Sequence, residues 1–190
     1  MMIVCVLSHG EEGTIITSDS QKVCIEKEII RKFNNENCDT LRGKPKLFLF
    51  QACRGQDIDY GVVQDKADSV MFQQMGMSRS VAIPPVEPKK DVSNSDMLIV
   101  YATLPGTNSD MLIVYATLPG YVALRDSQNG THFVHSFCKV LAEHAKDTEL
   151  SDLMYLVSED LRFNSGDDFK ETCVFENRLF KKLYLNPSLL

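Results

Sequence analysis

Two short apolar runs, each followed at once by a reactive side chain, constrain this chain more than any other feature. The run 2–7 (MIVCVL) leads into SHG, with His9 at its centre, and the run 46–50 (KLFLF) leads into QACRG, with Cys53 at its centre. Runs of this length and composition are typical of strands buried on both faces of a parallel sheet. Because the carboxyl ends of parallel strands meet at one edge, we expect His9 and Cys53 to lie together there.

The segment between the two runs carries a different period. Its apolar residues Ile25, Ile29, Ile30 and Phe33 fall at helical spacing, and the polar stretch 34–45 then leads to the second run. The order strand, helix, strand is the unit from which parallel sheets are built. The first third of the chain therefore predicts an α/β fold.

The predicted neighbours have the chemistry of a nucleophile and its partner. A thiol becomes a strong nucleophile at neutral pH beside a base or a positive charge, and the imidazole of His9 supplies either to Cys53. Gly10 allows close approach of a substrate, so its N–H and that of Cys53 are candidates for an oxyanion hole. Each residue alone is more often a loop histidine or an inert thiol. The pair, in these two contexts, favours cysteine-based catalysis.

The pentapeptide 51–55 (QACRG), with a histidine 44 residues upstream of its cysteine, resembles the signature of the caspase family. The resemblance implies a caspase-like α/β fold, with a mostly parallel central sheet flanked by helices. It also implies a cysteine endopeptidase that cleaves proteins after aspartate in programmed cell death, with catalytic His9 and Cys53.

The resemblance extends over nearly the whole chain. Residues 1–68 resemble the later part of the caspase large subunit, 69–93 an inter-subunit linker, and 94–190 the small subunit. Within the last region, apolar periodicity predicts a helix that follows a Thr131 cap and a second helix from Leu150. A final strand is expected over 178–185, with lysines at the sheet edge.

The family resemblance also implies a pocket for the substrate aspartate. Gln51 and Arg125 match two of the residues that form it, and a guanidinium suits a carboxylate partner. Tyr121 and Leu124 are expected in the same substrate-binding loop. Leu124 stands where the family usually has tryptophan, so the neighbouring subsite is expected to stay apolar and to change shape.

The beginning of the chain departs from the family pattern. Caspases carry two further strands, a helix and a second pocket arginine upstream of the segment that 2–7 resembles. Without those strands, one side of the 2–7 strand is expected to be an open, hydrophobic sheet edge. We interpret the sequence as part of a caspase that lacks the N-terminal strands of the family fold.

An exact duplication is a second departure. The 13 residues 94–106 recur as 108–120, separated by Thr107. Repeat folds need at least three units, so this is no solenoid. The second copy runs directly into the 121–130 loop, and we therefore predict that 111–117 occupies the strand position beside the Cys53 strand.

The linker holds a candidate processing site. Asp68 is preceded by Asp65 and followed by Ser69, an acidic stretch with a small residue after the cut, which resembles a caspase cleavage site. Cleavage there would give residues 1–68 and 69–190. The family resemblance further implies a homodimer of processed chains, protein substrates with aspartate at the cleavage site, and regulators of apoptosis as partners.

Composition gives no support for a nucleic-acid-binding, membrane or metal-binding protein. The 190 residues carry a net charge of −6, and neither basic patches nor an apolar stretch of about 18 residues suggests nucleic acid or membrane as a partner. The six cysteines lack zinc-like spacing, so no metal or organic cofactor is expected. Cys5 and Cys138 are expected to be reduced core thiols, and the protein to be cytoplasmic. Two alternatives remain open: a catalytically inactive, caspase-like dimerisation partner, and a related cysteine peptidase with basic specificity.

Overall fold

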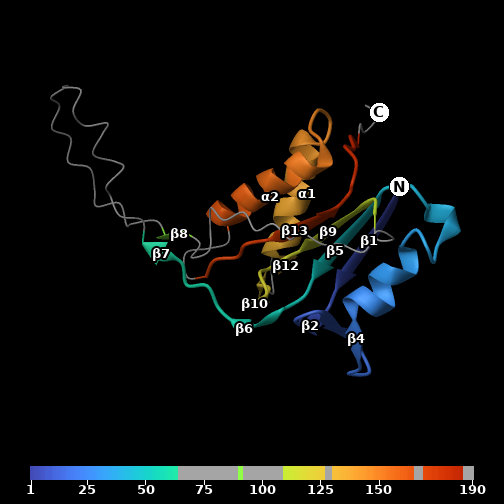
Figure 1. Ribbon diagram of the computed structural model, residues 1–190. Coiled ribbons are helices and arrows are strands. Elements are labelled where there is room, and N and C mark those ends of the chain that lie inside the picture. Colours follow the sequence, from blue (N-terminus) through green and yellow to red (C-terminus); the bar gives the residue numbers. More distant parts are fainter. Residues whose placement is uncertain (64–89, 92–108, 127–129, 165–168, 186–190) are drawn as a thin grey trace, which may run out of the picture.

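A four-stranded sheet organises the molecule, in the order β1-β5-β9-β13. In the computed structural model the described residues are 1–63, 90–91, 109–126, 130–164 and 169–185. Strands β1 (Met2–Leu7), β5 (Lys46–Gln51) and β9 (Met111–Tyr115) are parallel, and β13 (Val174–Arg178) runs antiparallel to β9 (Figure 1). The mostly parallel α/β fold expected from the sequence is confirmed.

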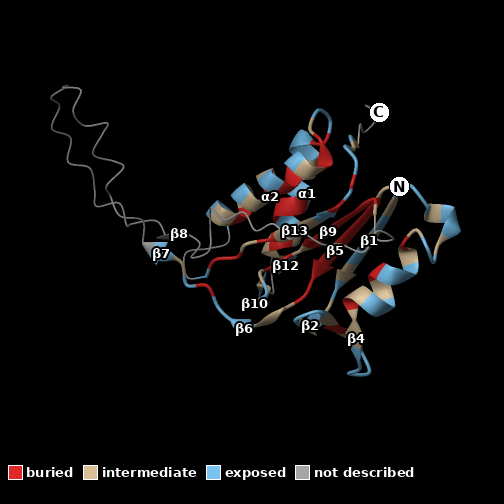
Figure 2. Cartoon of the chain, in the orientation of Figure 1, coloured by how far each residue is buried: buried red, intermediate tan, exposed pale blue. Residues whose placement is uncertain are grey.

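The two central strands are buried on both faces, as their composition predicts. On β5, Leu47 and Leu49 point to one side of the sheet, while Phe48 and Phe50 point to the other and stack with ring centroids 6.3 Å apart. Figure 2 shows this burial concentrated along β5 and β9. The sheet therefore separates two apolar clusters.

Two helices cover one face of the sheet, α1 (His132–His144) and α2 (Leu150–Asn164). The Thr131 hydroxyl caps α1 by accepting from the backbone N–H of Val134 at 3.4 Å, which confirms the predicted cap. Their inward residues join Leu47 and Leu49 in one cluster. Among the described residues, no helix is long and apolar enough to cross a membrane.

The opposite face is covered by shorter, irregular elements. The predicted helix is present as a π-helical turn η1 (Ile25–Ile29) followed by a 3₁₀ turn η2 (Ile30–Phe33). Before it lies a small antiparallel sheet that the apolar pattern does not reveal. Its strands are β2 (His9–Glu11), β3 (Thr14–Ile16) and β4 (Lys22–Cys24).

The remaining elements are short and lie mainly in the loops that follow β5 and β9. They are η3 (Asp39–Leu41), β6 (Gly55–Asp57), β7 (Val62–Val63), β8 (Lys90–Asp91), β10 (Gly120–Tyr121), β11 (Arg125–Asp126) and β12 (Gly130–Thr131). Pairing of β6 with β10 ties together the loops that follow β5 and β9, and pairing of β11 with β12 closes a hairpin within the loop after β9.

The expectation that 2–7 is buried on both faces is wrong, because β1 is an edge strand covered on one face only. Val4 and Val6 pack against the cluster around Phe48, whereas Ile3 is 54% and Leu7 59% exposed. Cys5 lies on the same open face, and Cys138 on α1 is exposed as well. The prediction that these two thiols belong to the core is therefore also wrong.

The final strand lies earlier than predicted. It covers Val174–Arg178, and the backbone of Leu179 turns to a φ of 53°, which interrupts an extended strand. The chain beyond it still contributes apolar side chains, and Leu183 accepts a hydrogen bond from the Leu150 amide at 2.8 Å. Phe180, Leu183 and Leu185 thus pack against the helical cluster, whereas Leu179 and Tyr184 are exposed.

The second copy of the duplicated segment supplies β9, between β5 and β13, as predicted. The first copy (94–106), most of the linker 69–93 and the candidate processing site Asp68 lie outside the described residues. The proposed division of the chain at these points stays a prediction.

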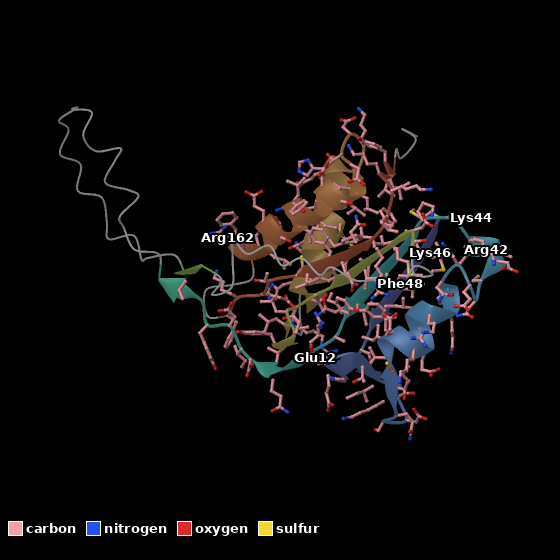
Figure 3. The ribbon with its side chains drawn as sticks, in the orientation of Figure 1. Glu12, Arg42, Lys44, Lys46, Phe48 and Arg162 are labelled. Carbon is pink, nitrogen blue, oxygen red and sulfur yellow. The ribbon has the colours of Figure 1, made fainter. Side chains whose placement is uncertain are left out.

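One charged residue lies within the sheet. Lys46, at the start of β5, is fully buried, and its Nζ donates to Asn35 Oδ1 and to the Lys44 carbonyl, each at 3.0 Å (Figure 3). Burial lowers the pKa of Lys46, an effect that the nearby Asp110 carboxylate opposes. This polar group lies at the amino end of β5, away from the edge that carries Cys53.

Candidate active site

A cleft of about 340 Å³ opens at the carboxyl edge of β1 and β5 and brings together four of the predicted site residues: His9, Gln51, Cys53 and Arg125. Leu124 of the predicted substrate-binding loop lines it as well. The lining also includes residues that the sequence did not single out: Leu7, Ser8, Ala52, Val122, Ala123 and Thr131. Most of these residues are chain neighbours of a predicted residue. That position was the only indication in the sequence that they would line the cleft.

Backbone hydrogen bonds hold the two catalytic candidates at this edge. The Ser8 amide donates to the Gln51 carbonyl at 3.0 Å, which continues the β1–β5 pairing to the last residue of β5. The Ser8 hydroxyl donates to the Ile16 carbonyl at 2.5 Å and so joins the main sheet to β3. His9 follows directly as the first residue of β2, while Cys53 follows the end of β5 by two residues.

Gly10 fits its position because no side chain has room there. A Cβ at this residue would stand 2.7 Å from the Thr14 carbonyl oxygen and 2.9 Å from that of Cys53. Both distances are shorter than van der Waals contact allows. The backbone of Gly10 is therefore packed directly against that of Cys53, which is the proximity that a shared oxyanion hole requires.

Cys53 and Gln51 occupy different depths of the cleft. The Cys53 thiol is partly exposed, and it donates a long hydrogen bond to the Ala123 carbonyl at 3.9 Å. Gln51 is only 6% exposed, and within the described part of the chain its Oε1 has no hydrogen-bond partner. A half-turn of that amide would direct its NH₂ group, a donor, to the same place. The floor of the cleft thus holds an uncommitted polar side chain.

The loop that carries Arg125 is fixed to the rest of the site by its backbone. The Arg54 amide donates to the Tyr121 carbonyl, and the Val122 amide to the Asp57 carbonyl, each at 2.9 Å. The Leu124 amide donates to Glu171 Oε1 at 3.1 Å. Arg125 itself is exposed and begins β11, with its guanidinium group uncommitted to any recorded ion pair in the described part of the chain.

Arg54, the fourth residue of the QACRG segment, serves the scaffold. Its guanidinium carbon lies 4.2 Å from the centre of the Tyr115 ring, and burial lowers its pKa. Burial also raises the pKa of Tyr115, to about 12, although Arg54 opposes this effect. The pair joins the ends of β5 and β9 beneath the Arg125 loop.

Glu171 is the most perturbed acidic group near the site, and the sequence analysis missed it. Burial raises its pKa to about 8, against the opposing effect of the hydrogen bond from Leu124. No sequence signal distinguishes it from the two aspartates shortly before it. Its carboxyl group contacts a loop 47 residues away in the chain, which the sequence does not reveal.

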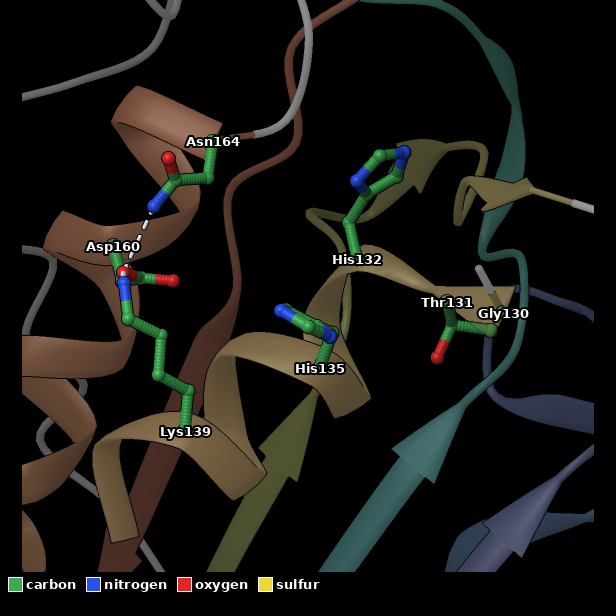
Figure 4. Close-up of a pocket in the computed structure, with 7 residues that line it drawn as sticks. All are labelled: Gly130, Thr131, His132, His135, Lys139, Asp160 and Asn164. Carbon is green, nitrogen blue, oxygen red and sulfur yellow. Dashed lines mark hydrogen bonds and ion pairs between the residues drawn. The ribbon is translucent and has the colours of Figure 1, made fainter. Parts of the chain in front are cut away.

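A second hollow adjoins the cleft through Thr131, which lines both (Figure 4). It measures about 490 Å³, and Figure 4 shows His132 and His135 on the first turn of α1. On its far side Asp160 accepts from Lys139 at 2.6 Å and from Asn164 at 2.8 Å. The Lys139–Asp160 pair joins α1 to α2, and the Asn164–Asp160 bond lies within α2.

Three predicted residues are not among those that line the cleft. Gly10 lies in β2 next to His9, and its part in an oxyanion hole stays a prediction. Tyr121 lies in β10, where its backbone pairs with Asp57 of β6, and its role in substrate binding stays a prediction. Asp68 lies outside the described residues. Within the described part, no cluster of three or more His, Cys, Asp or Glu side chains is placed to hold a metal ion.

The fold and the cleft together define an α/β protein that places a cysteine and a histidine at the carboxyl edge of a mostly parallel sheet. The family model described as the caspase domain matches residues 1–184. The chain belongs to the caspase domain family.

Curated relatives match most of this chain. It is 34% identical over 196 residues to caspase-2 of Gallus gallus and 33% identical over 187 residues to caspase-7 of Gallus gallus, which covers 97% and 94% of the chain and 42% and 53% of the relatives. Cell death protein 3 of Caenorhabditis remanei is 32% identical over 206 residues, covering 97% of the chain and 37% of that relative. The chain thus spans about half or less of the length of these relatives.

Proposed function

We propose that this chain forms the catalytic cleft of a cysteine endopeptidase that cleaves proteins after aspartate and acts in programmed cell death. The observation that carries the proposal is the cleft itself. It gathers a partly exposed thiol, an imidazole, an uncommitted amide and an uncommitted guanidinium on one edge of a caspase-family sheet. The relatives' names, caspase and cell death protein, support the process.

In the proposed reaction, His9 accepts the proton of the Cys53 thiol, and the sulfur attacks the backbone carbonyl carbon of the substrate aspartate. A carbon–sulfur bond forms, and the carbonyl electrons move to oxygen, where the N–H groups of Gly10 and Cys53 stabilise the charge. As the tetrahedral intermediate collapses, the peptide C–N bond breaks, and His9 donates a proton to the leaving amine. Water then hydrolyses the thioester and restores the thiol.

Selection of aspartate is assigned to Gln51 and Arg125. Arg125 presents a planar array of donors at the cleft, which matches a carboxylate in two hydrogen bonds. The Gln51 amide, turned with its NH₂ outward, donates a further bond from the floor. A neutral asparagine in the substrate would leave the guanidinium without its counter-charge, so discrimination rests on charge and shape together.

The proposal includes the assembly of the active protein. Cleavage at Asp68 separates the large- and small-subunit regions, and two processed chains associate as a homodimer that meets regulators of apoptosis in the cytoplasm. These statements derive from the family resemblance and stay predictions. A second arginine and further strands, expected upstream in caspases, would complete the pocket and the sheet.

The test is cleavage of paired fluorogenic peptides that differ only in aspartate or asparagine before the scissile bond. We expect turnover of the aspartate peptide alone, and loss of roughly 10³-fold or more in kcat/KM for Cys53→Ala. Cys38→Ala is the matched control, since that residue directly precedes η3 and does not line the cleft, and it should retain wild-type turnover.

The alternative is an inactive, caspase-like dimerisation partner. It predicts that neither peptide is cleaved and that an aspartyl fluoromethyl ketone fails to label Cys53 in the folded chain. Cleavage after lysine or arginine in preference to aspartate would instead favour a related peptidase of basic specificity. Either result would overturn the proposed function.

A further inference from the structure

The loop that lines one side of the catalytic cleft is held by a buried acid from another part of the chain. Glu171 is 2% exposed and lies three residues before β13, and its Oε1 accepts from the Leu124 backbone amide at 3.1 Å. Leu124 is followed directly by Arg125, and both line the cleft. The hydrogen bond therefore connects buried Glu171 to Leu124, the neighbour of Arg125 in the cleft.

The position of Arg125 depends on few other attachments. On its amino-terminal side the loop is fixed by the Tyr121 and Val122 backbones, and on its carboxyl-terminal side Arg125 pairs with Thr131. Between these two anchors, the Leu124 amide donates a hydrogen bond to the buried Glu171 carboxyl group. Loss of that bond would free the loop at Leu124, the residue next to Arg125. It would also remove a hydrogen bond from the buried carboxyl group of Glu171.

We propose that Glu171 is a positioning residue for substrate binding, whose buried carboxyl oxygen fixes the Leu124 amide and thereby keeps Arg125 directed into the cleft. The role in substrate binding rests on the proposed function, whereas the hydrogen bond and its effect on the loop do not. Because an amide oxygen accepts as a carboxyl oxygen does, glutamine is expected to replace Glu171 in this role and leucine is not.

The ionisation of Glu171 is expected to make its hydrogen bond with the Leu124 amide depend on pH. Burial raises the pKa to about 8, so at neutral pH the group is mainly the uncharged acid. The Cys173 thiol is in electrostatic contact with Glu171, and Lys170 stands beside it in the chain. Above the pKa the same amide donates to a carboxylate, a stronger and shorter bond.

The first test follows the Leu124 amide by NMR in the full chain, labelled with ¹⁵N, from pH 6 to pH 9.5. We expect its proton resonance to move downfield with a midpoint near 8, and to stop titrating in Glu171→Gln. The Leu153 amide, buried in α2 and bonded to the Glu149 carbonyl, is the internal control and should not titrate. A Leu124 resonance that does not move, or that titrates equally in Glu171→Gln, overturns the inference.

The second test separates positioning from a general structural role. For the aspartate peptide we expect Glu171→Gln to stay within about 2-fold of wild type in KM, and Glu171→Leu to raise KM about 10-fold with kcat little changed. Unchanged KM in Glu171→Leu, with wild-type turnover present, overturns the inference. A wild-type chain that an aspartyl fluoromethyl ketone does not label overturns the proposed function instead, and the Leu124 titration then decides the role of Glu171 by itself.

Discussion

At position 10 the surrounding backbone leaves no room for even a single methyl group. Gly10→Ala would place a Cβ 2.7 Å from the Thr14 oxygen and 2.9 Å from the Cys53 oxygen, so β2 must move away from the cysteine. We expect kcat/KM on the aspartate peptide to fall roughly 10²-fold or more, because the oxyanion donors separate. We also expect a stability loss on the order of 1–3 kcal/mol by urea unfolding.

The matched control for that substitution is Gly43→Ala. Gly43 has a φ of 68° and open space around its Cβ position, so alanine there costs about 1 kcal/mol of backbone strain without crowding any neighbour. Activity should remain at the wild-type level. Equal losses of activity in the two variants would show that general destabilisation, and not the approach of Gly10 to Cys53, is responsible.

The raised pKa of Glu171 also predicts how the free energy of unfolding depends on pH. Its pKa is about 8 in the folded chain and about 4.3 when unfolded, so the folded state binds more protons between these values. The free energy of unfolding should therefore decrease as the pH rises from about 4 to about 8, by up to roughly 5 kcal/mol from this group. Urea midpoints at pH 5, 6.5, 8 and 9 measure it. Glu171→Gln should flatten this part of the profile; an unaltered slope contradicts the prediction.

Among the elements, the helical turn η1 and strand β13 are joined by one cation. Arg178 is buried and contacts both Glu26 oxygens, at 3.0 and 3.1 Å, and both Glu176 oxygens, at 2.8 and 3.2 Å. Arg178→Leu removes the cation that bridges the two partly exposed carboxylates of Glu26 and Glu176. We expect a loss of roughly 2 kcal/mol in urea unfolding, less than for a fully buried pair.

Arg42→Leu is the control for the ion-pair substitution. Arg42 pairs with Asp39 within one turn, and both side chains are largely exposed, so the expected cost is about 0–1 kcal/mol. A loss at Arg42 that equals the loss at Arg178 would mean that the contact between η1 and β13 contributes nothing beyond an ordinary surface pair.

The elements also show where sequence reasoning succeeds. β5, β9, α1 and α2 carry long, regular apolar patterns with one structural interpretation each, and all four were predicted. β2, β3 and β4 have three residues each, too few for a period to appear. The last strand was misplaced because 179–185 is apolar for packing against the helices, while the backbone turn at Leu179 is invisible in the sequence.

The candidate site divides in the same way. Residues that belong to short linear motifs, such as His9, Cys53 and Gln51, could be predicted because each motif carries its own context. Arg125 required the family resemblance. Glu171 could not be predicted, because its importance arises from burial and from a partner far away in the chain. Side chains that support a loop through the core have no local signal.

On the scale of the whole molecule, the sheet has one open face at its first strand. Ile3, Cys5 and Leu7 point to the side that α1 and α2 cover further along the sheet, and all three remain exposed, although Cys5 lies within electrostatic reach of Cys138 on α1. β1 is also an edge strand, with a row of backbone groups on its outer side in the described structure. An exposed apolar edge of this kind is the feature through which sheets associate.

We therefore expect the chain to self-associate in a concentration-dependent way, and Ile3→Lys to reduce that association. Ile3 is more than half exposed, so a lysine there buries no charge and should change the free energy of unfolding by less than about 0.5 kcal/mol. Sedimentation velocity over a range of concentrations measures the effect. Phe163→Lys, at an equally exposed apolar position on α2, controls for added positive charge. If both variants shift the distribution equally, the net charge of the molecule controls its association, and the open face of β1 does not.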